Sequence, residues 1–157
     1  GCGRRGCLEA FCSGPAICRQ VAEGLAAVGA ASQLDPQMFC DASPRVAIEG
    51  LWHAWQAGDT YAHAVMDTVL DRLGWGLGLV LTLLDPQVVA VHGYVLEGKS
   101  AWLDEVRRRA GRWTLHSARR NNRVEFGLAS WDDEIRVAAC SYAYPSGGLS
   151  GNMPASP

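Results

Sequence analysis

Two cysteines near the start of the chain bracket a short, glycine-flanked turn. The stretch from Cys2 to Cys7 reads Cys-Gly-Arg-Arg-Gly-Cys and is followed by Leu8 and Glu9. Glycine permits the tight backbone that lets two thiolates point at one ion. A structural zinc site needs four ligands, so on spacing alone a zinc site and plain thiols remain equal alternatives.

Four of the six cysteines lie within the first 18 residues, and this clustering favours a metal site over a disulfide framework. Cys12 and Cys18 could add ligands, although helical geometry would spread them away from the first pair. For Cys18, Cys40 and Cys140 we predict plain burial, because a free cysteine behaves as a small hydrophobic residue.

The other polar and aromatic residues give weaker signals. The spacing of His53, His63 and His116 is typical of neither a metal site nor a catalytic set, and we expect the six tryptophans to be core and interface residues. Seven arginines run from Arg107 to Arg123 without an intervening acid. We interpret them as a solvated helix end and loop; phosphate or DNA contact is the alternative.

Apolar periodicity and breaker residues predict the elements that position these side chains. Residues 29–40 are expected to form a loop with a turn at Asp35-Pro36. The predicted helices are Glu9 to Ala27 (interrupted at Ser13 to Pro15), Pro44 to Ala57 (capped by Ser43), Tyr61 to Leu84 (capped by Asp59 or Thr60), Ser100 to Ala110 and Asp132 to Tyr144; the predicted strands are Val88 to Val91 and Arg123 to Gly127.

The helix from Tyr61 to Leu84 is apolar nearly all round in its second half, so we expect that half to be deeply buried. Gly74, Gly76 and Gly78 lie there and should permit close backbone packing. The two strands alternate with helices and would join a parallel or mixed sheet. Two strands are too few for a stable sheet, and the chain begins without Met, so we expect it to be part of a longer reading frame.

Composition limits the class of protein. The 157 residues have a mass of 16.9 kDa, are 48% hydrophobic and carry a net charge of −2, which indicates one globular domain or lobe without a strongly basic nucleic-acid footprint. The longest apolar run, Leu73 to Leu84, is shorter than the roughly 20 residues of a membrane span. We expect a cytoplasmic protein with no membrane segment, and a flexible tail over residues 145–157.

The stretch from Cys2 to Gly14, Cys-Gly-Arg-Arg-Gly-Cys-Leu-Glu-Ala-Phe-Cys-Ser-Gly, resembles the zinc signature of the ROK family (repressors, uncharacterised open reading frames and sugar kinases). The family pattern is Cys-x-Cys-Gly-x-x-Gly-Cys-x-Glu, often followed by Ser-Gly. Tyr61 to Gly93 resembles the family's long helix, Asp-Pro turn and buried strand. Val124 to Ala143 resembles its closing strand and helix.

This resemblance implies an α/β, actin-like ATPase (ribonuclease-H-like) fold, of which residues 1–144 would be the helix-rich carboxyl-terminal lobe. It implies structural zinc: Cys2 and Cys7 match two of the family's ligands, and the others would precede Gly1. Glu9 matches the family's glutamate whose carboxylate accepts hydrogen bonds from sugar hydroxyls; a helix first-turn acid is the plainer alternative. No catalytic residue is assigned.

A glycine-rich nucleotide turn would follow the strand Val88 to Val91, where kinases of the family resemble Gly-Gly-Gly. This chain has His92, Gly93 and Tyr94. Backbone amides approach phosphate closely only where side chains are absent, so the two larger residues should crowd a nucleotide. We expect His92 to be a satisfied histidine at a strand end and Tyr94 to be a packing residue. Such a degenerate turn is similar to that of the family's regulators.

The resemblance therefore implies a sugar-responsive transcriptional regulator rather than an enzyme. Its partners would be a small sugar effector, DNA bound through a winged helix-turn-helix upstream, and further copies of itself in a homo-oligomer. The alternative is an ATP-dependent sugar kinase of the same family, for which ATP would be the phosphate donor. A third possibility is a degenerate family member that binds only protein partners.

Overall fold

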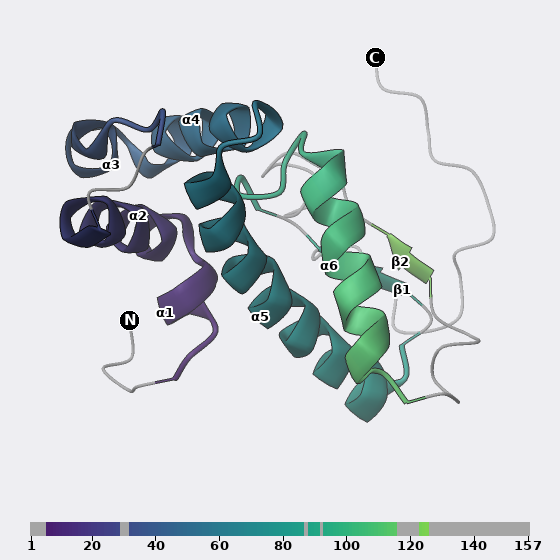
Figure 1. Ribbon diagram of the computed structural model, residues 1–157. Helices are drawn as coiled ribbons and strands as arrows, with labels where there is room; N and C mark the ends of the chain where they lie inside the picture. The colour runs from purple at the N-terminus through teal and green to yellow at the C-terminus, as the bar shows by residue number, and fades with distance from the viewer. Residues whose placement is uncertain (1–5, 29–31, 87, 92, 116–122, 126–157) are drawn as a thin grey trace, which may run out of the picture. The chain divides into compact units, whose positions relative to one another are not determined.

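The computed structural model describes residues 6–28, 32–86, 88–91, 93–115 and 123–125. These all belong to one compact unit, Gly1–Phe126. The helix expected from Asp132 and the tail expected from residue 145 lie outside the described residues. In chain order (Figure 1) the described elements are α1 (Glu9–Cys12), α2 (Gly14–Val28), α3 (Pro36–Asp41), α4 (Pro44–Gln56), α5 (Thr60–Leu84), β1 (Val88–Ala90), α6 (Ser100–Trp113) and β2 (Arg123–Glu125).

Capping residues explain where the predicted helices begin and end. Asp59 caps α5, since its Oδ1 accepts a hydrogen bond from the Ala62 N–H at 2.9 Å. Ser43 stands at the N-cap of α4 as predicted, but its hydroxyl makes no capping hydrogen bond, and Pro44 at the first position supplies the helical φ instead. α5 ends at Asp85, which adopts a left-handed conformation with φ of 40°.

The prediction of a loop over residues 29–40 is wrong in its second part, because α3 occupies residues 36–41. Asp35 Oδ1 accepts a hydrogen bond from the Gln37 N–H at 2.9 Å, and Pro36 takes the first helical position. An Asp-Pro pair serves a turn and a helix start equally well, and here burial of Phe39 favours the helix. Cys40 on this helix is exposed, which contradicts its predicted burial, whereas Cys18 is buried as predicted. Cys140 lies outside the described residues.

The long helix α5 packs chiefly against α6, and its other neighbours are α1, α2 and α4. Figure 1 shows α6 lying alongside α5. A Cβ at Gly74 would overlap Arg109 of α6, and one at Gly78 would lie 2.5 Å from the Trp113 Cβ. The prediction that these glycines permit close packing is therefore confirmed.

The buried core lies between α2, α4, the first half of α5, and α6. Its fully buried large side chains include Ile17, Val21, Ile48, Leu51, Met66, Val69, Leu70, Trp102 and Val106. The predicted burial of the second half of α5 is only partly right. Leu77 and Leu81 are buried, but Leu83 and Leu84 are 76% and 73% exposed.

Apolar composition does not indicate which faces of α5 contact other elements. Among the described residues, α6 covers one face of the second half of α5. The tryptophans divide in the same way. Trp102 is buried as predicted, whereas Trp75 and Trp113 are exposed.

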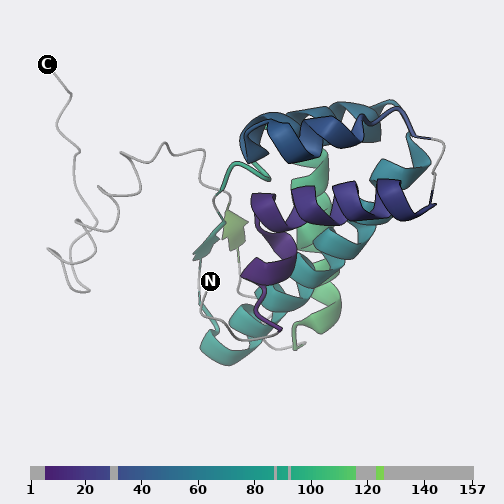
Figure 2. The same ribbon diagram turned by 90° about the vertical axis from the view of Figure 1, so that its left-hand side faces the viewer.

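β1 and β2 pair in parallel, with Val89 opposite Val124, and α6 connects them along the chain (Figure 2). The predicted parallel pairing is confirmed. Among the described residues, no helix combines the length and the apolar character that a membrane crossing requires.

Candidate functional site

The short helix α1 carries Glu9 in its first turn, where the side chain is exposed. Two apolar residues, Leu8 just before the helix and Phe11 within it, contact α5. The Leu8 side chain lies where Gly76 leaves room, since a Cβ there would be 2.8 Å from the Leu8 Cδ2. The Arg72 guanidinium lies 4.0 Å from the centroid of the Phe11 ring. Glu9 is therefore presented to solvent from a helix anchored on its other side.

The junction between α1 and α2 is held by further contacts. Gln20 Nε2 donates to the Phe11 carbonyl at 2.8 Å, and the Cys12 Sγ lies 3.7 Å from the Val69 carbonyl oxygen. Burial raises the pKa of the Cys12 thiol to about 11, against the smaller opposing effect of the Arg72 charge. Cys12 therefore remains a protonated packing residue at neutral pH.

Of the two predicted zinc ligands, the structure describes Cys7. It is half-buried and follows Gly6, whose φ of 83° is in the region that favours glycine. Cys2 lies outside the described residues. Within the described ranges no three His, Cys, Asp or Glu side chains lie close enough together to hold a metal ion. The described residues thus fit a zinc site only as a contribution of Cys7.

The turn after β1 contains Gly93 and Tyr94, and His92 lies outside the described residues. Gly93 has φ of 139°, and its carbonyl accepts hydrogen bonds from the N–H groups of Leu96 at 3.0 Å and Glu97 at 3.1 Å. Tyr94 is half-buried, and its ring packs against Gly14 at the start of α2. The structure therefore brings Tyr94 of the predicted turn to the junction that follows Glu9.

Charged residues of α4 hold the same turn. Lys99 is 2% exposed; its Nζ is 2.5 Å from Glu49 Oε1 and donates to the carbonyls of Glu97 at 3.0 Å and Tyr94 at 3.4 Å. The Arg45 guanidinium pairs with Glu97 at 3.0 Å and lies 5.5 Å from the centroid of the Tyr94 ring. Sequence reasoning missed Lys99, whose one signal was that it is the single lysine among 14 basic residues.

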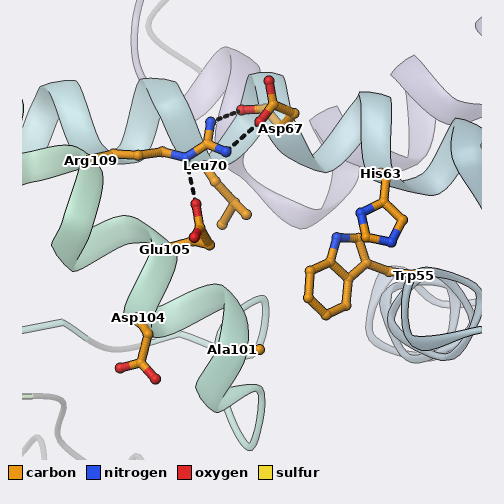
Figure 3. Close-up of a pocket in the computed structure, with 8 residues that line it drawn as sticks. All are labelled: Trp55, His63, Asp67, Leu70, Ala101, Asp104, Glu105 and Arg109. Carbon is orange, nitrogen blue, oxygen red and sulfur yellow. Dashed lines mark hydrogen bonds and ion pairs between the residues drawn. The ribbon is translucent and has the colours of Figure 1, made fainter. Parts of the chain in front are cut away.

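A separate surface cavity of about 510 Å³ lies between α4, α5 and α6. Its lining residues, shown in Figure 3, are Trp55, His63, Asp67, Leu70, Ala101, Asp104, Glu105 and Arg109. The Arg109 side chain is 9% exposed and binds the Asp67 carboxylate, the Asp67 carbonyl at 2.6 Å and Glu105 at 3.2 Å. The interpretation of this arginine as solvated is wrong, because it ties α6 to α5. None of the lining residues belongs to the site predicted from the sequence.

Comparison with known proteins agrees with this architecture. The ROK family matches residues 1–138. The chain belongs to the ROK family. Over 110 residues the ROK chain is 28% identical to the uncharacterized protein YphH of Escherichia coli (strain K12), which covers 70% of this chain and 26% of YphH.

A solved ROK family transcriptional regulator, described as a homolog of the E. coli MLC protein, matches with a TM-score of 0.63 and 24% identity. That match covers 80% of the ROK chain and 30% of the solved one, so the chain spans less than a third of the length of either relative. Family and neighbour together imply the actin-like ATPase-type fold, here in a helix-rich chain.

Proposed function

We propose that the ROK chain is the carboxyl-terminal, effector-sensing part of a sugar-responsive transcriptional regulator. The observation that carries this proposal is the turn after β1. A nucleotide-binding turn needs bare backbone amides, but here the Tyr94 side chain follows Gly93 and packs back onto α2. The solved neighbour, itself a transcriptional regulator, supports the same choice.

Glu9 is the proposed sugar contact. An ionised carboxylate accepts hydrogen bonds from two neighbouring hydroxyls, and a ligand without those hydroxyls leaves it unpaired. The exposure of Glu9 and the anchoring of α1 on α5 suit this role, because the carboxylate is accessible while its backbone is held.

Regulation would work by linkage. Sugar bound at Glu9 favours one arrangement of the protein, and that arrangement changes the DNA affinity of a winged helix-turn-helix in another part of the complete protein. A homo-oligomer in the cytoplasm, where the DNA is, completes the proposal. No membrane partner is involved.

Structural zinc is the proposed cofactor, with Cys2 and Cys7 among its ligands. When bound, it would hold the segment that leads into Glu9. Replacing Cys7→Ser in the complete protein should lower zinc content measured by atomic absorption, together with thermal stability. Unchanged zinc content would exclude Cys7 as a ligand.

The sugar site is tested by Glu9→Gln in the complete protein, with Glu23→Gln on the exposed surface of α2 as control. Titration calorimetry with D-glucose, D-mannose, N-acetyl-D-glucosamine and D-xylose measures binding. Loss of hydrogen bonds to a charged acceptor should weaken the best sugar roughly 10- to 100-fold. Glu23→Gln should bind as the wild type does. Equal affinity in wild type and Glu9→Gln would remove Glu9 from the site.

The alternative function is an ATP-dependent sugar kinase. Gly93 favours it, because its positive φ retains one element of a glycine turn. ATP-dependent phosphorylation of any of these sugars by the complete protein, followed by release of ADP in a coupled assay, would establish the kinase and displace the regulator.

A further inference from the structure

We propose that Tyr94 is a positioning residue that couples the segment bearing Glu9 to the turn of residues 93–99, so that a sugar at Glu9 also orders this turn. The role of the sugar rests on the proposed function above. The contact between the two segments does not, since it is present in the chain without any ligand.

The first link is the contact of Tyr94 with Gly14. A Cβ built at Gly14 would overlap the Tyr94 hydroxyl and lie within 2.6 Å of its ring carbon Cε2. Real Cβ atoms do not approach other atoms so closely, so the phenol occupies space that only glycine leaves free. Burial, the largest influence, raises the pKa of the Tyr94 hydroxyl, and the nearby Cys18, one helical turn beyond Gly14, acts in the same direction. The ring therefore lies along one face of the start of α2.

The second link is the short path from Glu9 to Gly14. Four residues lie between them, and hydrogen bonds join α1 to α2 across this segment. Gln20 of α2 donates to the Phe11 carbonyl at 2.8 Å, and Arg19 of α2 donates to the Ala10 carbonyl at 3.4 Å. A ligand that immobilises α1 therefore also restricts Gly14 and the space available to Tyr94.

The third link runs from Tyr94 into the turn. The Tyr94 carbonyl and the Glu97 carbonyl share the Lys99 ammonium, which is held in place by Glu49. Arg45 contacts both the Tyr94 ring and the Glu97 carboxylate. Because the turn joins β1 to α6, a restraint on Tyr94 acts on the connection between these two elements.

A second glycine–tyrosine pair on α2 supplies a matched control. A Cβ at Gly24 would lie in the same way on the Tyr61 hydroxyl, but Tyr61 belongs to α5 and hydrogen-bonds the Val21 carbonyl at 3.1 Å. Gly24→Ala therefore disturbs α2 by the same kind of clash without touching the turn of residues 93–99.

Amide hydrogen exchange of peptides that cover residues 93–99, read by mass spectrometry in the complete protein, tests the inference. Without ligand, Gly14→Ala should speed exchange there roughly fivefold or more, at the low end of usual coupling strengths, while Gly24→Ala should not. In a chain that already carries Tyr94→Leu, Gly14→Ala should cause no further increase in exchange over residues 93–99, because the methyl group no longer meets the phenol. Equal effects of Gly14→Ala and Gly24→Ala, or no effect of either, would overturn the coupling.

The second arm adds D-glucose, D-mannose, N-acetyl-D-glucosamine or D-xylose at saturation. A bound sugar should slow exchange over residues 93–99 in the wild type and not in Tyr94→Leu. The sugar affinity of Tyr94→Leu should differ from that of the wild type by no more than the lost coupling factor. A sugar that binds without slowing this exchange overturns the inference and leaves the proposed function standing. If none of the four sugars binds, the proposed function fails, and the ligand-free arm still decides the coupling.

If Gly14→Ala does not fold, as judged by circular dichroism, Tyr94→Leu alone decides the question. It should fold, because it removes bulk rather than adding it, and loss of the sugar-dependent slowing in this variant is the expected result. Retention of that slowing contradicts the inference.

Discussion

Asp59 shows how one buried carboxylate joins segments that are distant in the chain. Its side chain, 6% exposed, accepts hydrogen bonds from Ser32 Oγ at 2.8 Å, the Gln33 N–H at 2.7 Å and the Ala62 N–H at 2.9 Å. It thus caps α5 and also holds the segment that follows α2. A buried carboxylate is tolerated because its oxygens are hydrogen-bonded.

We expect Asp59 to make stability depend on acid pH. Burial is the largest single influence and acts to raise its pKa, but the hydrogen bonds from Ala62, Gln33, Ser32 and Tyr61 together lower it below the usual value of 3.8. A lowered folded-state pKa gives stability that is present above the unfolded pKa and lost as pH falls through the folded one. Urea unfolding of the wild type should therefore show a falling free energy of unfolding below about pH 4.

Asp59→Asn should lower the free energy of unfolding at pH 7 by about 1–2 kcal/mol. The substitution turns one carboxylate oxygen, which accepts hydrogen bonds, into an NH₂ group that cannot accept them from the three donors around it. It should also flatten the acid dependence. Asp35→Asn, at the exposed cap of the short helix α3, is the control and should change both less. Identical pH profiles for wild type and Asp59→Asn would contradict the role assigned to Asp59.

The cysteines should differ in reactivity according to burial. Cys40 is exposed, whereas burial raises the pKa of the Cys12 thiol to about 11. Burial also raises the pKa of the Cys18 thiol, against the opposing effect of a backbone hydrogen bond. Because the thiolate is the reactive form, iodoacetamide at pH 7.5 should label Cys40 well before the other two in the native chain. Peptide mass spectrometry measures the order, and in urea the difference should vanish. Early labelling of Cys12 in the native chain would contradict its burial.

At the scale of elements, helix starts were predictable because a cap is a local signal. Ser43 and Pro44 located the start of α4, and the pair Asp59 and Thr60 located that of α5. Asp35 was assigned to a turn because an Asp-Pro pair occurs both in turns and at helix starts. The partners of Lys99 and Arg109 were not predictable. Glu49 lies 50 residues from Lys99 and Asp67 lies 42 from Arg109, and periodicity does not reveal which helix faces which.

The same distinction between local and long-range signals applies to the candidate site. Glu9 and Cys7 came from a local motif, and the packing of Tyr94 was expected from its type. Its partner Gly14 was not, because an 80-residue separation carries no local signal. The degree to which Glu9 and Tyr94 act together is thus a property of the fold and not of either motif.

The close approach of α5 and α6 should make Gly74→Ala destabilising. In a free helix alanine is favoured over glycine by roughly 1 kcal/mol. A loss of stability in Gly74→Ala would therefore come from the contact with α6 and not from helix propensity. At Gly74 the new methyl group meets the Arg109 Cβ and the Ala110 backbone nitrogen, neither of which can move without shifting α6. Thermal or urea unfolding should show a loss of about 1–3 kcal/mol.

Gly50→Ala is the matched control for that variant. Its methyl group would meet the far end of the Met38 side chain, which can rotate away. We expect a neutral or slightly stabilising effect from helix propensity. Gains of stability in both variants would show that α5 and α6 are not in close contact.

At the scale of the whole molecule, exposed apolar side chains of the described residues gather where α5 and α6 end. Leu83 and Leu84 near the end of α5, and Trp113 and Leu115 at the end of α6 and just beyond it, are all at least half exposed. Thr82 Oγ1 donates to the Trp113 carbonyl at 3.3 Å and accepts from the Leu115 N–H at 3.2 Å, so these two ends lie side by side. Exposed apolar residues gathered at one place promote association in water.

The 157-residue chain expressed alone should therefore bind the dye ANS and associate as its concentration rises, and Leu83→Gln with Leu84→Gln should reduce both. Glutamine keeps helix propensity, so the circular dichroism spectrum and unfolding midpoint should stay close to those of the wild type. Leu81→Gln is the contrasting variant, because Leu81 is buried and its replacement should cost about 2–5 kcal/mol of stability. Sedimentation velocity measures association. If the double variant unfolds as Leu81→Gln does, these leucines belong to the core rather than to an exposed surface.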